Sequence, residues 1–348
     1  LLWEDDCGAH TAQGDDIRTE DLPEGAPEIT EQLGDEESWD TAVNFFLTSM
    51  DPSTVKDDVY VFIIDRQGRI VWLHEVPPTR TSLHPRVALD QKSLLIDHGS
   101  FWSQFDGGAA SQVLRLRIDG TVQETLETPG LHHPFTDLED GSLVWAAWKS
   151  GSETLEVLSP EGVQSTLWDC QTYFESIDSS EVCASNSLSW NPDRDVFLYS
   201  LYSVETVLEI DRNSGELLSS FGGFGDVWDF DPAESRFFWQ HGAHFLDNGH
   251  LLLSGQIAEG EEGVAREYSL DRESQILREV WSISQGVETA TMGEVHRLSS
   301  GHTLHNYGST TRLHEYTADG EIVWELVWDG EFIGRSTPIE DLYALDSW

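Results

Sequence analysis

The chain has 348 residues, of which 39% are hydrophobic, so it can form one large domain or two ordinary ones with a substantial core. Its formal net charge of −45 excludes nucleic acid as a natural electrostatic partner, because the phosphates would be repelled, and disfavours anionic membranes. Such acidity suits either a protein kept soluble in high salt or an acidic secreted protein. No apolar run approaches the length of about 20 residues that spans a bilayer, so we expect no membrane insertion.

Residues 1–55 are acidic and rich in glycine and proline, which predicts an irregular N-terminal arm with one strand at the apolar patch Val43–Leu47. From Val59 onward, β-branched and aromatic residues alternate between Gly, Asp and Asn turns, and helical periodicity is nearly absent. We therefore predict a single all-β domain over residues 56–348. Because the chain starts at Leu1 and shows no signal-peptide pattern, we expect a processed or trimmed mature form.

A hairpin unit of strand, Asp-x-Gly-like turn and strand recurs along this domain. Its copies follow each other at roughly 40 to 60 residues, a spacing typical of repeat architectures. The six turns lie at 65–68, 119–120, 160–162, 211–215, 271–274 and 319–320.

A second unit precedes each of the last five hairpins and can be aligned without gaps on the apolar residue five places after its start. Glycine recurs eight places after the start in three copies, at Gly141, Gly249 and Gly301. The aligned starts are His84, His133, Ser185, His241 and Gly293.

Two hairpins in each repeat make a four-stranded antiparallel sheet, which cannot bury both faces alone. Arranged radially, each sheet packs on its neighbours, so the pattern predicts a six-bladed β-propeller closed by N- and C-terminal strands. A parallel β-helix is the alternative, although its repeats are shorter.

The cysteines indicate an oxidising compartment. Cys170 and Cys183 bracket a polar segment, a spacing that suits a loop-closing disulfide, and no Cys or His metal-binding spacing competes with it. Cys7 is left over in the arm and is most simply a free thiol. We therefore expect a secreted or periplasmic protein.

The first strand of each propeller blade lines the central channel, so equivalent positions on different blades converge there. His84, His133 and His241 share one register position, which predicts a common site, whereas a lone histidine is more often simply hydrogen-bonded. His244 and His296 both lie three places after the start of an aligned unit. In a regular strand, where side chains alternate, a residue at the start and one three places later face opposite sides of the sheet, so both can face the channel only if the strand is irregular. We rank His241, His133 and His296 above His244.

Several segments resemble the bacterial arylsulfotransferase superfamily over about residues 58–330. They are Ser185–Leu188, Leu208–Glu216 followed by Phe221–Gly223, Gln240–Ala243, Arg266–Tyr268 and Gly293–Leu304. The resemblance implies a six-bladed periplasmic propeller that moves a sulfuryl group from one phenol to another through a histidine nucleophile, without a nucleotide donor.

The resemblance also implies roles for particular residues. His241 becomes an active-site histidine, His296 the nearest counterpart of the nucleophile, and Arg266 lies close to where the family places an arginine that neutralises the sulfuryl oxygens. The family's His-x-Asn-Ser motif has Ala184 in place of its histidine, while Asn186 and the following serine are retained.

Three functions follow from these patterns. In the first, which needs no cofactor, an imidazole attacks the sulfur or phosphorus of a small aryl ester, a second histidine protonates the phenolate, and Arg266 or His133 stabilises the charge. In the second, His84, His133 and His241 bind a divalent metal ion that activates water for hydrolysis of a phosphotriester, lactone or sulfate ester, with Glu294 as ligand or base. In the third, the chain is a non-catalytic binding propeller.

Overall fold

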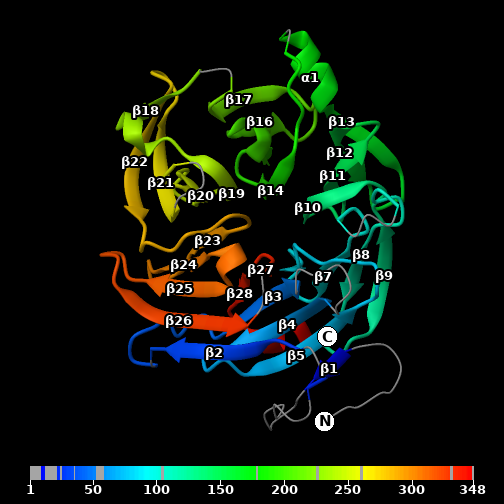
Figure 1. The fold of residues 1–348 in the computed structure, drawn as a ribbon. Coiled ribbons are helices and arrows are strands. Elements are labelled where there is room, and N and C mark those ends of the chain that lie inside the picture. Colours follow the sequence, from blue (N-terminus) through cyan, green and yellow to red (C-terminus); the bar gives the residue numbers. More distant parts are fainter. Residues whose placement is uncertain are drawn as a thin grey trace. The chain divides into compact units, whose positions relative to one another are not determined.

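The computed structural model describes residues 9–11, 22–23, 26–34, 36–51, 59–102, 106–177, 179–224, 227–258, 262–329 and 332–346 (Figure 1). Cys7 lies outside these ranges. The described residues form two compact units, the first from those up to Pro129 together with those from His296 onward, and the second from Gly130–Val295. Each unit contains three sheets.

The second unit consists of three consecutive sheets, coloured green to gold in Figure 1. The first sheet is β10 (Leu131–Asp137), β11 (Leu143–Lys149), β12 (Ser152–Leu158) and β13 (Gln164–Asp169). The second is β14 (Ser185–Asn191), β15 (Val196–Leu201), β16 (Thr206–Asp211) and β17 (Leu217–Gly222). The third has the order β18 (Asp229–Asp231), β22 (Ile276–Ile283), β21 (Gly263–Asp271), β20 (Leu251–Gln256) and β19 (Phe238–Phe245).

The core of this unit lies between neighbouring sheets. Along β15, Phe197 and Tyr199 pack toward the sheet that begins with β10, whereas Val196 and Leu198 pack toward the sheet that contains β19. Every residue of β15 is buried, because its sheet lies between two neighbouring sheets that cover both of its faces. Radial packing of sheets thus explains why alternate residues of one strand belong to different cores.

The first unit is built from the two ends of the chain. One sheet has the order β1 (Ala9–Thr11), β5 (Ile70–Val76), β4 (Val59–Asp65), β3 (Phe45–Asp51) and β27 (Phe332–Ile333), with β28 (Thr337–Ile339) also paired to β3. The next is β6 (Arg86–Val87), β7 (Leu94–His98), β8 (Gln112–Leu116) and β9 (Val122–Glu127). The last is β2 (Glu28–Leu33), β26 (Ile322–Asp329), β25 (Arg312–Tyr316), β24 (Thr303–Asn306) and β23 (Glu294–Arg297), whose last strand crosses the boundary between the units.

The N-terminal segment differs from the irregular arm with one strand that the sequence predicted. It supplies β1, β2 and β3, which join two sheets of the first unit. The partners of β2 and β3 include β26, β27 and β28, which lie near the other end of the chain. These pairings confirm the predicted closure by N- and C-terminal strands. Composition alone did not show that the arm itself forms strands, because they are stabilised by residues about 300 positions away.

The predicted hairpins are confirmed at all six positions, where the turns join β4 to β5, β8 to β9, β12 to β13, β16 to β17, β21 to β22 and β25 to β26. The aligned glycines close equivalent turns, since the amide groups of Gly141, Gly249 and Gly301 donate to carbonyl oxygens three residues earlier. The fold is therefore the six-bladed β-propeller that the repeats predicted. Neighbouring strands in these sheets run antiparallel, apart from β18 with β22. This antiparallel pairing excludes a parallel β-helix.

A disulfide joins Cys170 and Cys183, as predicted, with their Cα atoms 6.2 Å apart. Between them, the short helix α1 (Cys170–Ser176) is capped by Asp169, whose carboxylate accepts from the amide of Thr172 at 2.6 Å. Short 3-10 turns complete the structure at η2 (Tyr202–Val204), η3 (Ala233–Ser235), η4 (Gly308–Thr310) and η5 (Leu342–Asp346).

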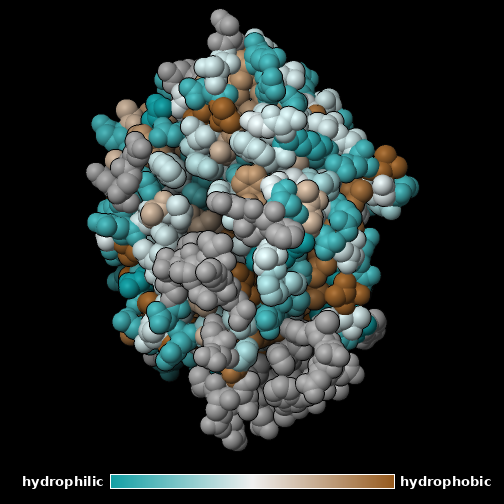
Figure 2. All heavy atoms as spheres, turned by 45° about the vertical axis from the view of Figure 1, so that its right-hand side comes forward, coloured by the Kyte–Doolittle hydropathy of each residue, from teal (hydrophilic) through white to brown (hydrophobic). Residues whose placement is uncertain are grey.

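The described surface has the polar character expected from the composition. On the coloured part of the face in Figure 2, hydrophilic side chains are widespread, with apolar ones scattered between them. Within the described residues, no helix has the length and apolar character needed to cross a membrane.

Candidate active site

The inner strands of the second unit, β10, β14 and β19, lie side by side, and each is irregular near its start. The register shifts between Leu131 and Phe135 in β10, between Ser185 and Ser187 in β14, and on both sides of His241 in β19. Bulges of this kind re-aim side chains and are common next to active sites. The aligned starts His133, Ser185 and His241, with Asn186 one place after Ser185, therefore lie in the irregular stretch of each strand.

The irregularity in β19 decides which way its two histidines face. His241 pairs with Ser254 and His244 with Leu252, so three residues of β19 oppose two residues of β20. Cross-strand partners share a face, and Ser254 and Leu252 are two residues apart, so the register places both histidines on one side of the sheet. Gly242 makes this possible, since its φ of 61° lies in the left-handed region that glycine tolerates.

The ring of His241 is held by the main chain. Its Nδ1 lies 2.8 Å from the carbonyl oxygen of Trp239, and this carbonyl can only accept a hydrogen bond. Nδ1 therefore carries a proton, and in the neutral ring Nε2 keeps the lone pair that a nucleophile or base needs. His244 has the same arrangement with the carbonyl oxygen of Gly242, at 2.9 Å.

Asn186 connects β14 to β19. Its side-chain amide donates to the carbonyl oxygen of Gln240 at 2.7 Å, which fixes the orientation of the group. Its Oδ1 is buried and has no hydrogen-bond partner among the described residues. A buried acceptor of this kind is costly unless a ligand or water donates to it. Gln240, the residue before His241 on β19, has a structural role. Its side-chain amide donates to the hydroxyl of Ser200 and to two carbonyl oxygens.

Two further predicted residues lie in this unit near the same strands. Glu294 is buried and packs against Gly242, where a Cβ atom on the glycine would lie 3.2 Å from the Cα and Cγ atoms of Glu294. His133 is buried on β10, and its ring lies edge-on to that of His132 with centroids 4.3 Å apart.

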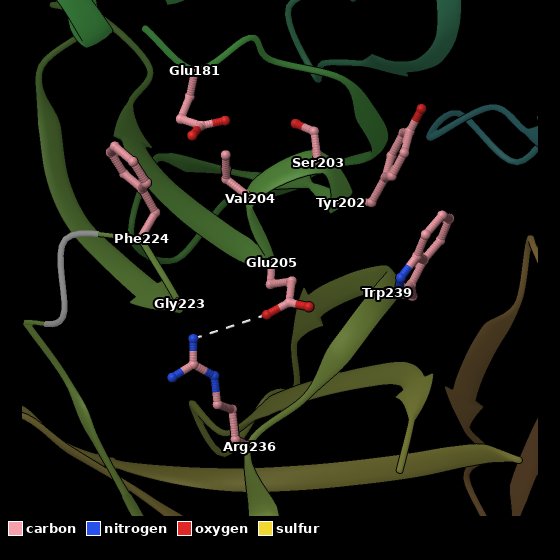
Figure 3. A pocket seen from close by; sticks show the side chains of 9 residues that line it. All are labelled: Glu181, Tyr202, Ser203, Val204, Glu205, Gly223, Phe224, Arg236 and Trp239. Carbon is pink, nitrogen blue, oxygen red and sulfur yellow. Dashed lines mark ion pairs between the residues drawn. The ribbon is translucent and has the colours of Figure 1, made fainter. Parts of the chain in front are cut away.

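A pocket of about 380 Å³ opens beside β19. Figure 3 shows Tyr202 and Trp239 together on one side of it, where their rings stack with centroids 5.6 Å apart, and Glu205 reaching toward Arg236. The closest nitrogen and oxygen of that ion pair are 3.9 Å apart. Trp239 also lines a narrow crevice that contains His241. The sequence analysis did not single out this pocket, although Trp239 stands two residues before His241.

The remaining predicted residues lie elsewhere. Arg266 is on β21, separated from β19 by β20, and its guanidinium pairs with Glu279, so its role toward sulfuryl oxygens stays a prediction. His84 and His296 belong to the first unit, where the amide of His84 donates to Asp97 at 3.0 Å and His296 is half-buried on β23. Across the described ranges, no group of three or more His, Cys, Asp or Glu side chains is arranged to hold a metal ion.

Fold and site together define a β-propeller whose inner strands carry histidines at one aligned position, with an asparagine one place after it on the strand between them, all in irregular stretches. The profile of the family described as arylsulfotransferase (ASST) matches residues 154–329, about half of the chain. The chain therefore belongs to the arylsulfotransferase family. Membership supports a transferase that moves sulfate groups on aryl compounds. A search of curated protein sequences found no match.

Solved structures share the fold at low sequence identity. A protein of unknown function from Bacteroides caccae is 17% identical with a TM-score of 0.56, covering 86% of this chain and 100% of its own. TolB from Acinetobacter baumannii is 13% identical with a TM-score of 0.53, covering 85% of this chain and 66% of its own. A functionally unknown protein from Desulfotomaculum acetoxidans is 11% identical with a TM-score of 0.53, covering 84% and 88%. These likenesses bear on the fold alone.

Proposed function

We propose that this chain transfers a sulfuryl group from one aryl compound to another, with His241 as the nucleophile. The observation that carries the proposal is the bond between Nδ1 of His241 and the carbonyl oxygen of Trp239, which leaves Nε2 as the reactive nitrogen. His241 is a better candidate than His244 because the residue that orients it also lines the aromatic pocket.

The chemistry proceeds in two displacements. The Nε2 lone pair attacks sulfur, the bond from sulfur to the aryl oxygen breaks, and the phenolate leaves with the bonding pair and takes up a proton. A second phenol then attacks the sulfur of the sulfohistidine, the N–S bond breaks, and the phenol's proton passes to a base. Water in place of the second phenol would give hydrolysis.

Neighbouring residues support this assignment by their chemistry. The stacked rings of Tyr202 and Trp239 offer an aromatic surface for an aryl group, and Arg236 is a cation in the same pocket. The unpaired Oδ1 of Asn186 is an acceptor that the hydroxyl of an incoming phenol would satisfy. The disulfide fits the oxidising, secreted or periplasmic location that we propose for the reaction.

The experiment uses an aryl sulfate such as para-nitrophenyl sulfate, with and without an added phenol. We expect phenolate release that accelerates with the phenol, formation of the new aryl sulfate, and a sulfuryl adduct on His241 in a digest of protein quenched without acceptor. His241→Ala should lower the rate by at least roughly a thousand-fold.

Two parallel variants identify the nucleophile. His244→Ala is the matched control, since it removes a ring held in the same way on the same strand, and it should keep most of the activity. His296→Ala tests the role that the family resemblance implies for that residue. An adduct on His296, or full activity in His241→Ala, would show that His241 is not the nucleophile.

A further inference from the structure

Gln240, the residue before His241, is completely buried and ties β19 to the neighbouring sheet. Its side-chain amide donates to the carbonyl oxygens of Leu201 and Thr206, both at 3.1 Å. These two residues pair with each other at the end of the β15–β16 hairpin, so the amide contacts both ends of the turn that joins the two strands. The amide also donates to the hydroxyl of Ser200 at 3.2 Å, and this hydroxyl donates to the carbonyl oxygen of Gln240 at 3.3 Å.

The turn that Gln240 holds forms part of the aromatic pocket. All four of its residues, 202–205, line the pocket, and the ring of Tyr202 stacks on Trp239 (Figure 3). Glu205 has a φ of 49° and Trp239 a φ of 47°, and such left-handed conformations are retained in bulky residues only where surrounding contacts enforce them. Gln240 directly follows Trp239, and its amide bonds the residue after Glu205. Its hydrogen bonds therefore lie next to both strained residues.

The backbone of Gln240 holds a second group of the candidate site. Its carbonyl oxygen accepts from the side-chain amide of Asn186 at 2.7 Å. This bond fixes the side chain whose buried Oδ1 is the acceptor offered to an incoming phenol in the proposed function. One residue thus contacts the aromatic turn and the asparagine, and is covalently joined to the proposed nucleophile.

We propose that Gln240 is a positioning residue, which sets where the ring of Tyr202 and the Oδ1 atom of Asn186 stand relative to His241. This inference rests on the proposed function. The side chain of Gln240 is completely buried, so it acts through these neighbours and not on the substrate itself. Transfer between two aryl compounds needs the reacting groups in one fixed geometry, and a displacement of about 1 Å can lower the rate about a hundred-fold.

A purely structural link between two sheets is the competing interpretation, and kinetics of Gln240→Met separate the two. Methionine has a similar length but no donor. A structural role would lower the folded fraction, and with it the apparent kcat, while KM stayed the same. A positioning role predicts that KM for para-nitrophenyl sulfate rises several-fold because the ring of Tyr202 moves, and that kcat/KM of the folded protein falls about a hundred-fold.

The tautomer of His241 provides a readout that needs no turnover. In nitrogen-15 spectra at about pH 9, above the ordinary range of imidazole titration, the wild-type ring should carry its proton on Nδ1, because the carbonyl oxygen of Trp239 accepts from it. The signal is identified by its absence from His241→Ala. Gln240→Met should add the tautomer with the proton on Nε2, since that carbonyl group is no longer held in place.

A double-mutant cycle tests whether Gln240 acts through Tyr202. In a Tyr202→Ala background, Gln240→Met should change KM little, so the two effects on KM are not additive. Ser200→Ala removes the hydroxyl that bonds both the amide and the carbonyl oxygen of Gln240, and it should shift KM and the His241 spectrum in the same direction by less. This milder variant keeps the test decisive if Gln240→Met does not fold.

Asn306 offers a matched control in the first unit. Its side-chain amide is also buried, and it donates to the carbonyl oxygen of Gly334 at 2.6 Å and to the hydroxyl of Ser336 at 2.8 Å. Asn306→Leu removes these bonds and should lower the urea midpoint. It should leave KM and the His241 spectrum unchanged.

The outcomes separate the two proposals. Folded Gln240→Met with a wild-type KM and a wild-type His241 spectrum would overturn the positioning role, and so would additive effects on KM in the cycle. A wild-type chain that transfers no sulfuryl group would overturn the proposed function. The His241 spectra of Gln240→Met and Ser200→Ala would then still decide whether Gln240 orients that ring.

Discussion

The Nδ1 atom of His241 lies 2.8 Å from the carbonyl oxygen of Trp239, two residues earlier in the same strand. Trp239 has a φ of 47°, a left-handed conformation that is unfavourable for a bulky residue and is usually retained only where surrounding contacts enforce it. Here the indole stacks on Tyr202. The aromatic pair therefore shapes the pocket and holds the backbone that orients the histidine.

Removing the ring of Tyr202 should therefore weaken both substrate binding and the orientation of His241. We expect Tyr202→Ala to raise KM for an aryl sulfate several-fold, since an aromatic pair contributes about 0.5–1.5 kcal/mol beyond its buried area. Tyr202→Phe keeps the stack and serves as the control. Steady-state kinetics of both variants provide the measurement, and equal KM values for the two would contradict the role of the stack.

Gly242 should be less replaceable than a glycine of similar conformation in a turn. Both Gly242 and Gly249 have positive φ, so alanine at either costs about 1–2 kcal/mol. A Cβ at Gly249 meets nothing within 4 Å, whereas at Gly242 it would lie 3.2 Å from atoms of Glu294. We expect Gly242→Ala to lower the free energy of unfolding by about 1–3 kcal/mol more than Gly249→Ala, as measured by urea denaturation. Equal losses of the free energy of unfolding in the two variants would show that Glu294 moves away from the added Cβ atom at little cost.

Local patterns were sufficient to predict the blades. The Asp-x-Gly turns and aligned glycines form hydrogen bonds within a few residues, so their sequence determines the hairpins directly. The same reasoning located the inner strands and the aligned position that His133 and His241 share, with Asn186 one place after the aligned Ser185.

The features that the sequence did not predict depend on how strands pair with each other. The bulge that brings His241 and His244 to one side depends on how β19 pairs with β20, and alternation alone predicts the opposite. Glu153 looks like an ordinary surface carboxylate in a Ser-Glu-Thr run, yet its partners His132 and Tyr199 come from two other strands. Such burial follows from tertiary packing and leaves no local signal.

The disulfide should stabilise the fold through a short loop. Cys170 and Cys183 are 13 positions apart and both pack in the core between the first two sheets of the second unit. For a loop of this size the chain-entropy estimate is about 3 kcal/mol. We expect reductant to lower the melting temperature of the wild-type chain, whereas a double Cys→Ser variant should start lower and not respond. A reductant-insensitive wild-type chain would contradict this expectation.

Acid should destabilise the first unit through a pair of buried histidines. The Nε2 atoms of His74 and His98 lie 3.0 Å apart, and burial lowers the pKa of His74 to about 4. Burial, with the neighbouring His74 and Arg80, lowers the pKa of His98 to about 3. Both rings are thus neutral in the folded chain at pH values where they would be charged in the unfolded chain.

The sign of the effect follows from which state binds more protons. Below the ordinary histidine value of 6.5, the unfolded chain takes up protons that the folded pair does not, so stability falls as the pH falls toward 4. At pH 5 each histidine contributes a loss of up to about 2 kcal/mol. Adjacent Asp97 acts in the opposite direction, since burial raises its pKa to about 6. Its contribution should largely cancel when variants are compared with the wild type.

We therefore expect the double variant His74→Gln and His98→Gln to lose less stability between pH 6.5 and pH 5 than the wild-type chain does, even if it is less stable at neutral pH because the pair is gone. Urea midpoints at the two pH values provide the measurement. Equal slopes in the double variant and the wild-type chain would mean that the acid sensitivity arises from other groups.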